Sequence, residues 1–524
     1  MSEAQDRDGG QNEEHHRQDR AASAEQVAYG TQVTKLEFRG GRFGSAVPML
    51  VFIVWAIGLS LLLADYGAPD ESGLILGVVI GLAVGLFLCR SSWSDYCQAI
   101  FDGLSQPVGV IAVACWIWAG MFAKVLSAGG LVDGLIWLGS VTGFSGGAFV
   151  VTTFLLAALF ATAVGTGYGT TIAFCELLYP AGLVLGADPL VLFAAVLSGA
   201  AFGDNLAPVS DTTIVSAVTQ QTDVPGVVRS RFRYAILAAI PAVVLFALLG
   251  GGGTADAQQA RALFGAMANP AGLILLIPFG LVIALAMSGR HIIVSITWGI
   301  VVAAGLILMT NLEPVADLLG GPLAGPEALL GLDFEQRAIT GALVDGINGF
   351  LKMGILILFI VTAGHIMAVG GALEGIKQGM MRVVKASVRR AELVMFATVA
   401  SLNAFITVNT AAEIAAAPFV SDMGKTFRLH PYRRANFLDS VSSAFGYIFP
   451  WSGGVLIGVA TLQGLGDRYT FVTAPSPMEV WPYVFHGWLL AAVMVMAALT
   501  GYGRRYEGAD GRPVKEPPVK EPVA

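Results

Sequence analysis

The chain has 524 residues, of which 55% are hydrophobic and only 13% are charged, and its mean hydropathy is +0.71. Apolar runs of membrane-spanning size recur from about residue 48 to about residue 500, which excludes a soluble domain with a single anchor. The net charge of −7 offers no basic surface, so we expect no nucleic-acid partner. The composition predicts a polytopic membrane protein surrounded by the lipid bilayer.

Both ends of the chain differ from its apolar middle. Residues 1–46 are polar and lack the apolar core of a signal peptide, so we expect a disordered cytoplasmic tail. The sequence PVKEP occurs twice near the other end, which predicts an extended proline-rich cytoplasmic tail over residues 501–524. We expect neither tail to carry the function.

Between the tails, the apolar segments form two halves whose elements follow the same order. The halves cover residues 47–250 and 269–500, and residues 251–268 form a linker. Each half is expected to contain three helices, a hairpin interrupted by small polar residues, a broken helix and one further helix. The expected hairpins cover residues 148–186 and 391–420, and the expected broken helices cover residues 190–218 and 435–462.

Lysine and arginine positions predict the orientation, because basic residues that flank membrane spans stay in the cytoplasm. Basic residues precede the first helix, follow the first broken helix and surround the second hairpin, whereas the loop over residues 313–335 is acidic. Arg229, Arg231 and Arg233 are assigned to a cytoplasmic loop, and no arginine is expected inside a helix. The first hairpin then enters from outside and the second from inside. We therefore expect an all-α polytopic membrane protein with two inverted-topology repeats, re-entrant hairpins and both termini in the cytoplasm.

The first broken helix contains an unusually polar stretch. Its sequence, SGAAFGDNLAPVSDTTIVSA from Ser198, places Asp204 and Asp211 on either side of Pro208. A charge at bilayer depth costs roughly 2.5 to 3.5 kcal/mol on insertion scales, so a carboxylate there indicates a function. A helix that stops and restarts within the membrane also leaves backbone groups free to bind a small cation.

Both hairpin tips add oxygen donors. The first tip, GTGYGTT from Gly165, carries Thr170 and Thr171, and the second carries Asn409 and Thr410. Hydroxyl, amide and carbonyl oxygens suit hard cations such as sodium or lithium. The alternative is that these hydroxyls only form hydrogen bonds between packed helices.

Three segments carry a resemblance to a known family. GDNLAPVSDTT from Gly203 is similar to the G-D-x-x-S-P-x-S-D-T-T signature of the NhaC family of sodium/proton antiporters. GTGYGT from Gly165 resembles that family's hairpin tip G-T-S-W-G-T, and LDSVSSAFGYIFPWSGG from Leu438 resembles its second-half segment ending in P-W-N-x-x-G. Ala207 and Ser452 depart from the family's serine and asparagine, which reduces the number of ligands.

The resemblance implies membership of the wider ion transporter superfamily, whose members move substrate by shifting a hairpin-bearing domain. It also implies a location in the prokaryotic plasma membrane, and it is compatible with a homodimer. Together with the residues, it predicts a secondary active transporter that exchanges sodium, or lithium, for protons across the cell membrane by alternating access. A proton or a cation can each neutralise a buried carboxylate, so both compete for one site.

The predicted site has one central carboxylate and several supporting oxygen donors. Asp211 is the predicted carboxylate shared by proton and cation, and Asp204 is a second sodium ligand or its electrostatic tuner, unless Asp204 only caps the restarted helix. The other predicted site residues are Asn205, Ser210, Thr212, Thr213, Thr170, Thr171, Asn409 and Thr410, and the secondary candidates are Glu413, Asp439 and Glu176.

Two other classes of function stay open. A sodium- or proton-coupled carrier of an organic acid or amino acid would need a further polar pocket or an unpaired arginine at the membrane midplane, and the sequence predicts neither. An intramembrane enzyme is suggested only by GFSG at residues 143–146, without a zinc-protease or phosphate-loop motif. The four cysteines lack C-x-x-C spacing, so no zinc site is expected. We expect neither an enzyme nor a cofactor, with sodium ions and protons as the transported ions.

Overall fold

A computed structural model describes most of the chain between residues 35 and 516. Most of the predicted N-terminal tail, over residues 1–34, most of the predicted linker and the last residues of the predicted C-terminal tail lie outside the described residues. The described ranges are 35–62, 71–208, 210–253, 269–288, 290–310, 329–333, 337–381, 387–466, 468–508 and 510–516.

The first half of the chain is helical, and its last five helices include a hairpin and a broken helix. The hairpin consists of α7 and α8, and the broken helix of α9 and α10. The elements are η1 Gly41–Ala46, α2 Val47–Leu62, α3 Glu71–Leu88, α4 Trp93–Leu104, α5 Pro107–Ala128, α6 Leu131–Thr142, α7 Gly146–Val164, α8 Gly167–Val184, α9 Pro189–Leu206, α10 Asp211–Thr219 and α11 Val224–Leu249.

The second half contains the same two features, with a hairpin of α18 and α19 and a broken helix of α20 and α21. Its helices are η2 Pro270–Leu275, α13 Leu276–Met287, α14 Ile292–Thr310, α16 Ala342–Val369, α17 Ala372–Met381, α18 Val388–Ile406, α19 Asn409–Thr426, α20 Pro431–Phe445, α21 Gly453–Leu465, α22 Pro477–Val480, η3 Trp481–Tyr483 and α23 Phe485–Thr500.

Two small antiparallel strand pairs accompany the helices, so the described chain is not purely α-helical. Strands β1 Gly331–Asp333 and β2 Ala338–Thr340 pair with Leu332 opposite Ile339. Strands β3 Tyr506–Glu507 and β4 Pro513–Val514 pair with Tyr506 opposite Val514.

The described helices are long and apolar enough for several membrane crossings. Seven of them pass by length and composition, and an eighth span is possible if the bent pair Pro477–Tyr483 and Phe485–Thr500 crosses together. The broken helix α9–α10 counts as one of the seven, over Pro189–Thr219. The chain is therefore an all-helical polytopic membrane protein apart from its short strand pairs.

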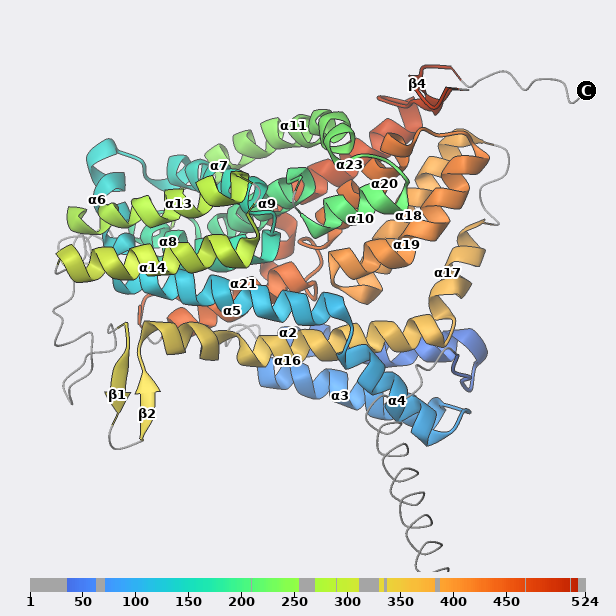
Figure 1. The fold of residues 1–524 in the computed structure, drawn as a ribbon, viewed down its shortest axis with the longest axis horizontal. Helices are drawn as coiled ribbons and strands as arrows, with labels where there is room; N and C mark the ends of the chain where they lie inside the picture. The colour runs from blue at the N-terminus through green and yellow to red at the C-terminus, as the bar shows by residue number, and fades with distance from the viewer. Residues whose placement is uncertain are drawn as a thin grey trace, which may run out of the picture.

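The hairpins lie in opposite halves of the molecule along its long axis. Figure 1 shows α7 and α8 toward one end and α18 and α19 toward the other. The first hairpin turns at Gly165, which adopts a φ of 76°, a conformation that glycine reaches without strain. The second turns at Thr407, whose φ is 63° although it is not glycine. Both turns adjoin the first break, because Gly165 and Val408 line one cavity with Asp204 and Asp211.

Both predicted tails are partly folded onto the body of the protein, which corrects their predicted extents. Leu36 and Phe38 are buried, and the Leu36 amide donates to the Val369 carbonyl at 3.0 Å. At the other end, Arg504 forms an ion pair with Glu392 at 2.6 Å, and Glu507 donates its amide to the Arg428 carbonyl. The buried apolar residues and the ion pair hold these parts of the tails on the body. The sequence did not reveal them, because they stand among polar neighbours.

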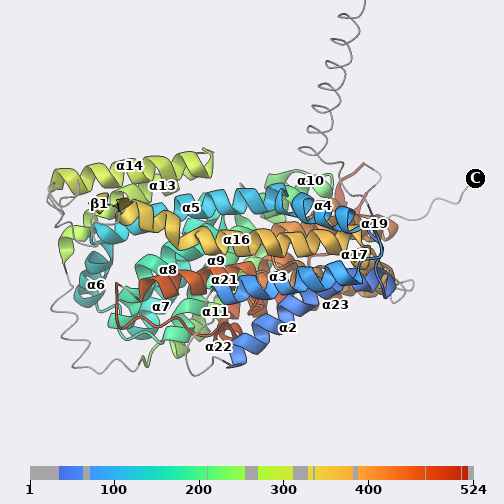
Figure 2. The same ribbon diagram turned by 90° about the horizontal axis from the view of Figure 1, so that it is seen from below.

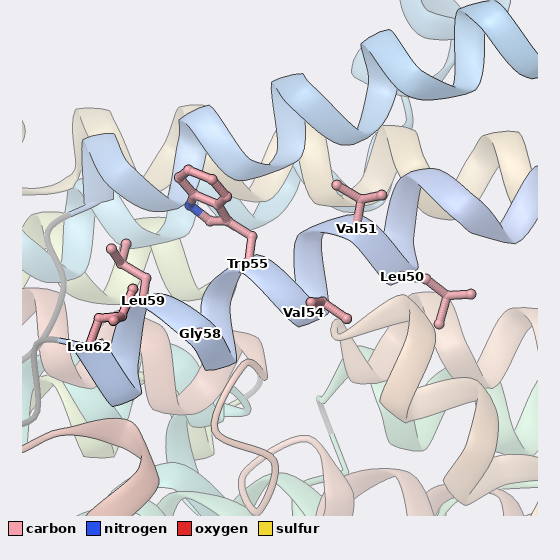
Figure 3. Close-up of a pocket in the computed structure, with 7 residues that line it drawn as sticks. All are labelled: Leu50, Val51, Val54, Trp55, Gly58, Leu59 and Leu62. Carbon is pink, nitrogen blue, oxygen red and sulfur yellow. The ribbon is translucent and has the colours of Figure 1, made fainter.

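Helix α2 lies at the edge of the molecule and exposes apolar side chains. Figure 2 shows α2 at one edge and α14 at the opposite one. Trp55 points from α2 toward α3 and donates its indole N–H to the Gly73 carbonyl at 2.9 Å (Figure 3). Beside it lies an apolar hollow of about 460 Å³ along α2. An exposed apolar surface of this kind is expected on a helix that faces lipid.

Helices α5 and α16 pack closely through glycines. A Cβ added at Gly346 would lie 2.6 Å from the Met121 amide nitrogen and 2.9 Å from the Gly120 carbonyl carbon. Close backbone contact between small residues is the usual way in which membrane helices pack. A Cβ at Gly349, one turn further along α16, would meet nothing within 4 Å.

Gly346→Ala should lower the stability of the folded protein by about 1 to 3 kcal/mol, because the new methyl group overlaps backbone atoms of α5 that cannot move away. Gly349→Ala is the matched control and should leave stability unchanged or slightly raised, since alanine favours a helix. Thermal unfolding of the two variants in detergent would measure the difference. Equal unfolding temperatures would contradict the close packing of α5 and α16.

Candidate functional site

Asp204 lies in the last turn of α9 and connects the two halves of the protein. The side chain is 3% exposed. Its carboxylate accepts hydrogen bonds from the Ser210 hydroxyl at 2.7 Å, the Asn409 side-chain amide at 2.8 Å and the Tyr447 hydroxyl at 3.3 Å. These donors come from the first break, the second hairpin and the second break. Asp204 therefore joins three of the four interrupted segments.

Asp211 is the first residue of α10 and is the more accessible carboxylate. One oxygen accepts the Thr212 amide at 2.9 Å, and the other accepts the Thr410 hydroxyl at 2.6 Å. Ser210 and Thr212 share a hydroxyl contact of 2.9 Å, which connects the surroundings of the two aspartates. The broken helix and the tip of the second hairpin thus form one hydrogen-bonded group.

Both aspartates line a cavity of about 170 Å³. A cavity of about 10 to 15 Å³ on this measure holds one water molecule, so this cavity has room for a cation together with water. The cavity is formed by both hairpin tips, by α5 and by the start of α14. Its lining residues are Ile111, Cys115, Trp116, Gly165, Thr166, Gly167, Tyr168, Asp204, Asp211, His291, Ile292, Val408, Asn409 and Thr410.

Helix ends surround this cavity. Its lining includes residues at the C-terminal ends of α7 and α9 and at the N-terminal ends of α8, α10 and α19. The N-terminal ends carry partial positive charge and favour carboxylates, whereas the C-terminal ends carry partial negative charge and favour cations. Asp211, Asn409 and Thr410 lie in the first turns of α10 and α19. The arrangement can therefore hold either a carboxylate with a cation or a neutral, protonated carboxyl.

A second buried cluster lies next to the first helix break and contains an ion pair. Arg231 of α11 and Asp439 of α20 are both fully buried and in direct contact. The Arg231 guanidinium also donates to the Asn205 carbonyl at 2.6 Å and to the hydroxyls of Thr213 and Ser216 at 3.2 and 3.0 Å. A cation at the C-terminal end of α9 is electrostatically favourable. Arg231 thus connects α11 to the first break and to α20.

The buried Arg231 corrects the prediction that this residue lies in a cytoplasmic loop and that no helix contains an arginine. Helix α11 begins at Val224, so Arg231 lies about two turns inside it. Val227, Arg231, Tyr234, Ala235 and Ala238 are all buried, at the spacing of one helix face. That spacing was visible in the sequence and would have found Arg231. Arg229, two residues earlier, is exposed.

The structure brings most of the predicted site residues together. Asp204, Asp211, Ser210, Thr212, Asn409 and Thr410 belong to the cavity group, and Thr213 and Asp439 to the Arg231 cluster. Asn205 contributes its backbone carbonyl to Arg231, while its buried side-chain amide has no hydrogen-bond partner among the described residues. Glu413 is fully buried on α19, and neither carboxylate oxygen has a hydrogen-bond partner in the described part of the chain.

Three predicted residues lie elsewhere. The hydroxyls of Thr170 and Thr171 donate to the Thr166 and Gly167 carbonyls of their own helix, at 2.7 and 3.1 Å. Neither residue lines the cavity. Glu176 pairs with Lys124 of α5 at 3.0 Å instead of joining the aspartates. For these three residues, the contacts fit the alternative that the polar side chain only bonds within its own helix or to a packed neighbouring helix.

Sequence reasoning missed two residues besides Arg231. Tyr447 follows Ala444, Phe445 and Gly446, which match Ala201, Phe202 and Gly203 ahead of Asp204. This similarity between the two halves would have indicated Tyr447, whose hydroxyl donates to the Asp204 carboxylate. His291 lines the cavity from the start of α14, and no motif in the sequence indicated it.

Breaking the Arg231–Asp439 pair from either side should destabilise the protein by about 3 to 5 kcal/mol, because an unpaired charge stays buried. Arg231→Gln and Asp439→Asn should each lower the unfolding temperature in detergent, and the double variant should recover part of the loss. Arg229→Gln, an exposed neighbour on α11, is the control and should unfold like the wild type. Additive losses in the double variant would contradict the pairing.

Comparison with known proteins places this geometry in a family. The model of the family described as "Na+/H+ antiporter family" matches residues 17–251 and 256–488. The chain belongs to this family. The assignment confirms the resemblance to the NhaC antiporters and identifies a membrane antiporter, so the chain is a transporter and not an enzyme.

Several curated relatives belong to the same group but carry different substrates in their names. The arginine/ornithine antiporter ArcD of Halobacterium salinarum is 25% identical over 85% of this chain and 92% of that protein. The malate-2H(+)/Na(+)-lactate antiporter of Bacillus subtilis is 26% identical over 64% of this chain and 70% of its own length. The Na(+)/H(+) antiporter NhaC of Alkalihalophilus pseudofirmus is 28% identical over 44% of this chain and 51% of its own length.

Proposed function

We propose that the chain exchanges sodium, or lithium, for protons across the prokaryotic plasma membrane. The observation that carries this proposal is the charge of the cavity. Asp204 and Asp211 line it, and its described lining includes neither lysine nor arginine. A small cation is the ligand that two carboxylates and several hydroxyl and carbonyl oxygens suit best.

Proton and cation would compete at this pair of carboxylates. Asp211 is accessible from the cavity and would exchange its proton for the cation, while Asp204, fixed by three donors, would complete the cation's ligands. A site holding either ion has less net charge than the empty site. An empty, doubly charged site would be costly to move through a low-dielectric barrier, so reorientation without an ion is suppressed.

We further propose that the two halves are inverted repeats and that the hairpins are re-entrant. The position of α7–α8 and α18–α19 in opposite halves of the molecule supports this topology (Figure 1). The start of α20 and the segment after α23 lie with α17 at one end, where arginines are frequent, which favours a cytoplasmic location for both termini. Movement of the hairpin tips against α5 would open the cavity to alternate sides. The homodimer compatible with the family resemblance stays a prediction.

Glu413 is proposed as a second proton carrier. Its fully buried carboxyl lies on α19, one turn after Asn409 and Thr410, and has no hydrogen-bond partner among the described residues. A buried carboxylate without partners is costly, so the group would hold a proton while the cation occupies the aspartates. Release of that proton would alter the number of protons exchanged per cation.

Asp211→Asn should abolish cation-dependent proton movement, because the neutral amide neither takes up a proton nor balances the charge of the cation. The measurement is dequenching of a pH-sensitive dye in everted vesicles from cells lacking endogenous antiporters, on adding sodium, lithium or potassium. Asp422→Asn is the matched control, since Asp422 is exposed on α19 and lines neither this cavity nor any site proposed below. Full activity of Asp211→Asn, with protein present in the membrane, would overturn the proposed site.

The same assay separates the supporting carboxyls. Asp204→Asn should lower the rate at least tenfold, because it loses one of the two charges that hold the cation. Glu413→Gln should keep exchange but weaken its dependence on the proton gradient, since one proton fewer moves per cycle. An unchanged gradient dependence in Glu413→Gln would remove Glu413 from the mechanism.

A cationic amino acid is the second candidate substrate. The length of the match to the arginine/ornithine antiporter and the size of the cavity favour it. Its side chain could pair with the two aspartates, but its own carboxylate would need a positive partner, and Arg231 is already paired with Asp439.

Counterflow in proteoliposomes would decide between these substrates. Vesicles loaded with unlabelled arginine should take up no labelled arginine under our proposal, whereas vesicles with a sodium gradient should move protons. Labelled arginine uptake that is lost in Asp211→Asn, with no response to sodium or lithium, would establish the second candidate instead.

A further inference from the structure

A second cavity, of about 400 Å³, lies between α11, α20 and the C-terminal segment and is rich in arginine. Its volume is within the range of ligand pockets, about 300 to 1,000 Å³. It shares no residue with the cavity that contains Asp204 and Asp211. The lining residues are Gly226, Arg229, Ser230, Arg233, Tyr432, Arg433, Asn436, Gly503, Arg505 and Pro513.

Three of these arginines lack an acidic partner. Arg433 shares the Glu392 carboxylate with Arg504, at 2.8 and 2.6 Å. Arg229, Arg233 and Arg505 form no ion pair with any acidic side chain of the described residues. Arg233 donates to the Ser230 carbonyl at 2.9 Å, and Arg505 makes only a long contact of 3.4 Å to the Arg504 carbonyl. Most of their donor groups thus remain available, and three like charges around one cavity repel each other unless an anion binds.

Asp223, at the start of α11, is used elsewhere. It accepts the Tyr432 hydroxyl at 2.6 Å and the Gly226 amide at 2.7 Å, which caps α11. The hydrogen bond from Tyr432 lowers the pKa of Asp223 below its ordinary value, so it stays ionised in that role. The acidic residue nearest in sequence to Arg229 and Arg233 therefore holds the pocket wall together and leaves these two arginines unpaired.

Buried polar groups form the floor of the pocket. Asn436 is 1% exposed, and its side-chain amide donates to the Ser230 hydroxyl at 2.9 Å. This contact fixes α20 against α11. The C-terminal segment covers another side through Gly503, Arg505 and Pro513, so its folding against the body completes the pocket.

An apolar track begins beside the pocket. Phe232, next to Arg233, is 54% exposed, and Leu237, Ile240, Val244 and Leu248 continue an exposed apolar surface along α11. A phospholipid whose headgroup entered the pocket could lay its acyl chains along this surface. Guanidinium groups bind phosphate oxygens in pairs, and basic pockets between membrane helices suit anionic headgroups.

We propose that this arginine pocket binds the phosphate of an anionic phospholipid headgroup. The pocket joins the same two helices as the Arg231–Asp439 pair. Arg231 lies between Arg229 and Arg233 on α11, and Asn436 lies one turn before Asp439 on α20. A bound phosphate therefore holds α11 against α20 next to the transport site, and through this contact promotes exchange. That last step rests on the proposed antiport function.

Native mass spectrometry of the purified full-length protein tests the binding without any transport. Phosphatidylglycerol should bind, and phosphatidylcholine, which has no net charge, should bind far more weakly. The double variant Arg233→Gln/Arg505→Gln should bind phosphatidylglycerol at least tenfold more weakly. The control Arg389→Gln/Arg390→Gln removes the same charge from exposed positions on α18 and should bind like the wild type.

Inorganic phosphate forms the second arm. If it raises the unfolding temperature of the wild type but not of the pocket variant, while phosphatidylglycerol does not bind, the site takes free phosphate and the lipid assignment is overturned. Equal phosphatidylglycerol binding by wild type, pocket variant and control overturns the pocket itself. Arg229→Gln, an exposed position, gives the same comparison if the double variant fails to fold.

Proteoliposomes test the consequence for exchange. Addition of phosphatidylglycerol to phosphatidylcholine vesicles should raise the exchange rate of the wild type severalfold and leave the pocket variant unchanged. An equal increase in both proteins would overturn the link to exchange. Absence of exchange in every vesicle would contradict the proposed antiport function, while the binding results would still decide the pocket.

Discussion

A fully buried ion pair constrains the packing of helices at the centre of this protein. Arg231 and Asp439 are fully buried, and an isolated charge in such a place is penalised by several kcal/mol. The two side chains must therefore remain together in the folded state, which fixes α11 against α20. Because the same guanidinium also binds the Asn205 carbonyl and two hydroxyls of α10, the first broken helix is positioned by the same contact.

The interrupted helices are stable because their free backbone groups find partners within the protein. Within a membrane, irregular backbone is tolerated only where protein or a water-filled cavity satisfies it. The Thr407 carbonyl at the second tip accepts the Gly453 amide at 3.0 Å, and the Asn409 carbonyl accepts the Ser442 hydroxyl at 3.0 Å. Two hairpin turns and two helix breaks thus bring polar groups together inside the protein.

Sequence analysis identified site residues where a polar side chain stood in an expected membrane span, because burying such a group there costs free energy. Asp204 and Asp211 stand out in an apolar run, and the family assignment and the hairpin positions follow from residues around them. The direction of a side chain was less predictable. Thr170 and Thr171 could have pointed to the cavity or back to their own helix, and only the local rotamer decides between these. Arg231 was missed because it stands between Arg229 and Arg233, which made a helix residue look like part of a basic loop.

The turns of the two hairpins differ in how easily they can deform. Gly165 adopts its positive φ freely, whereas the β-branched Thr407 adopts its positive φ at a cost of about 1 to 3 kcal/mol. The two halves, each with a hairpin followed by a broken helix, thus contain one relaxed turn and one strained turn. A cycle that moved both tips would relieve strain at only one of them, so its two end states would differ in energy. The transporter would therefore rest with one side open in the absence of any gradient, despite the similarity of its halves.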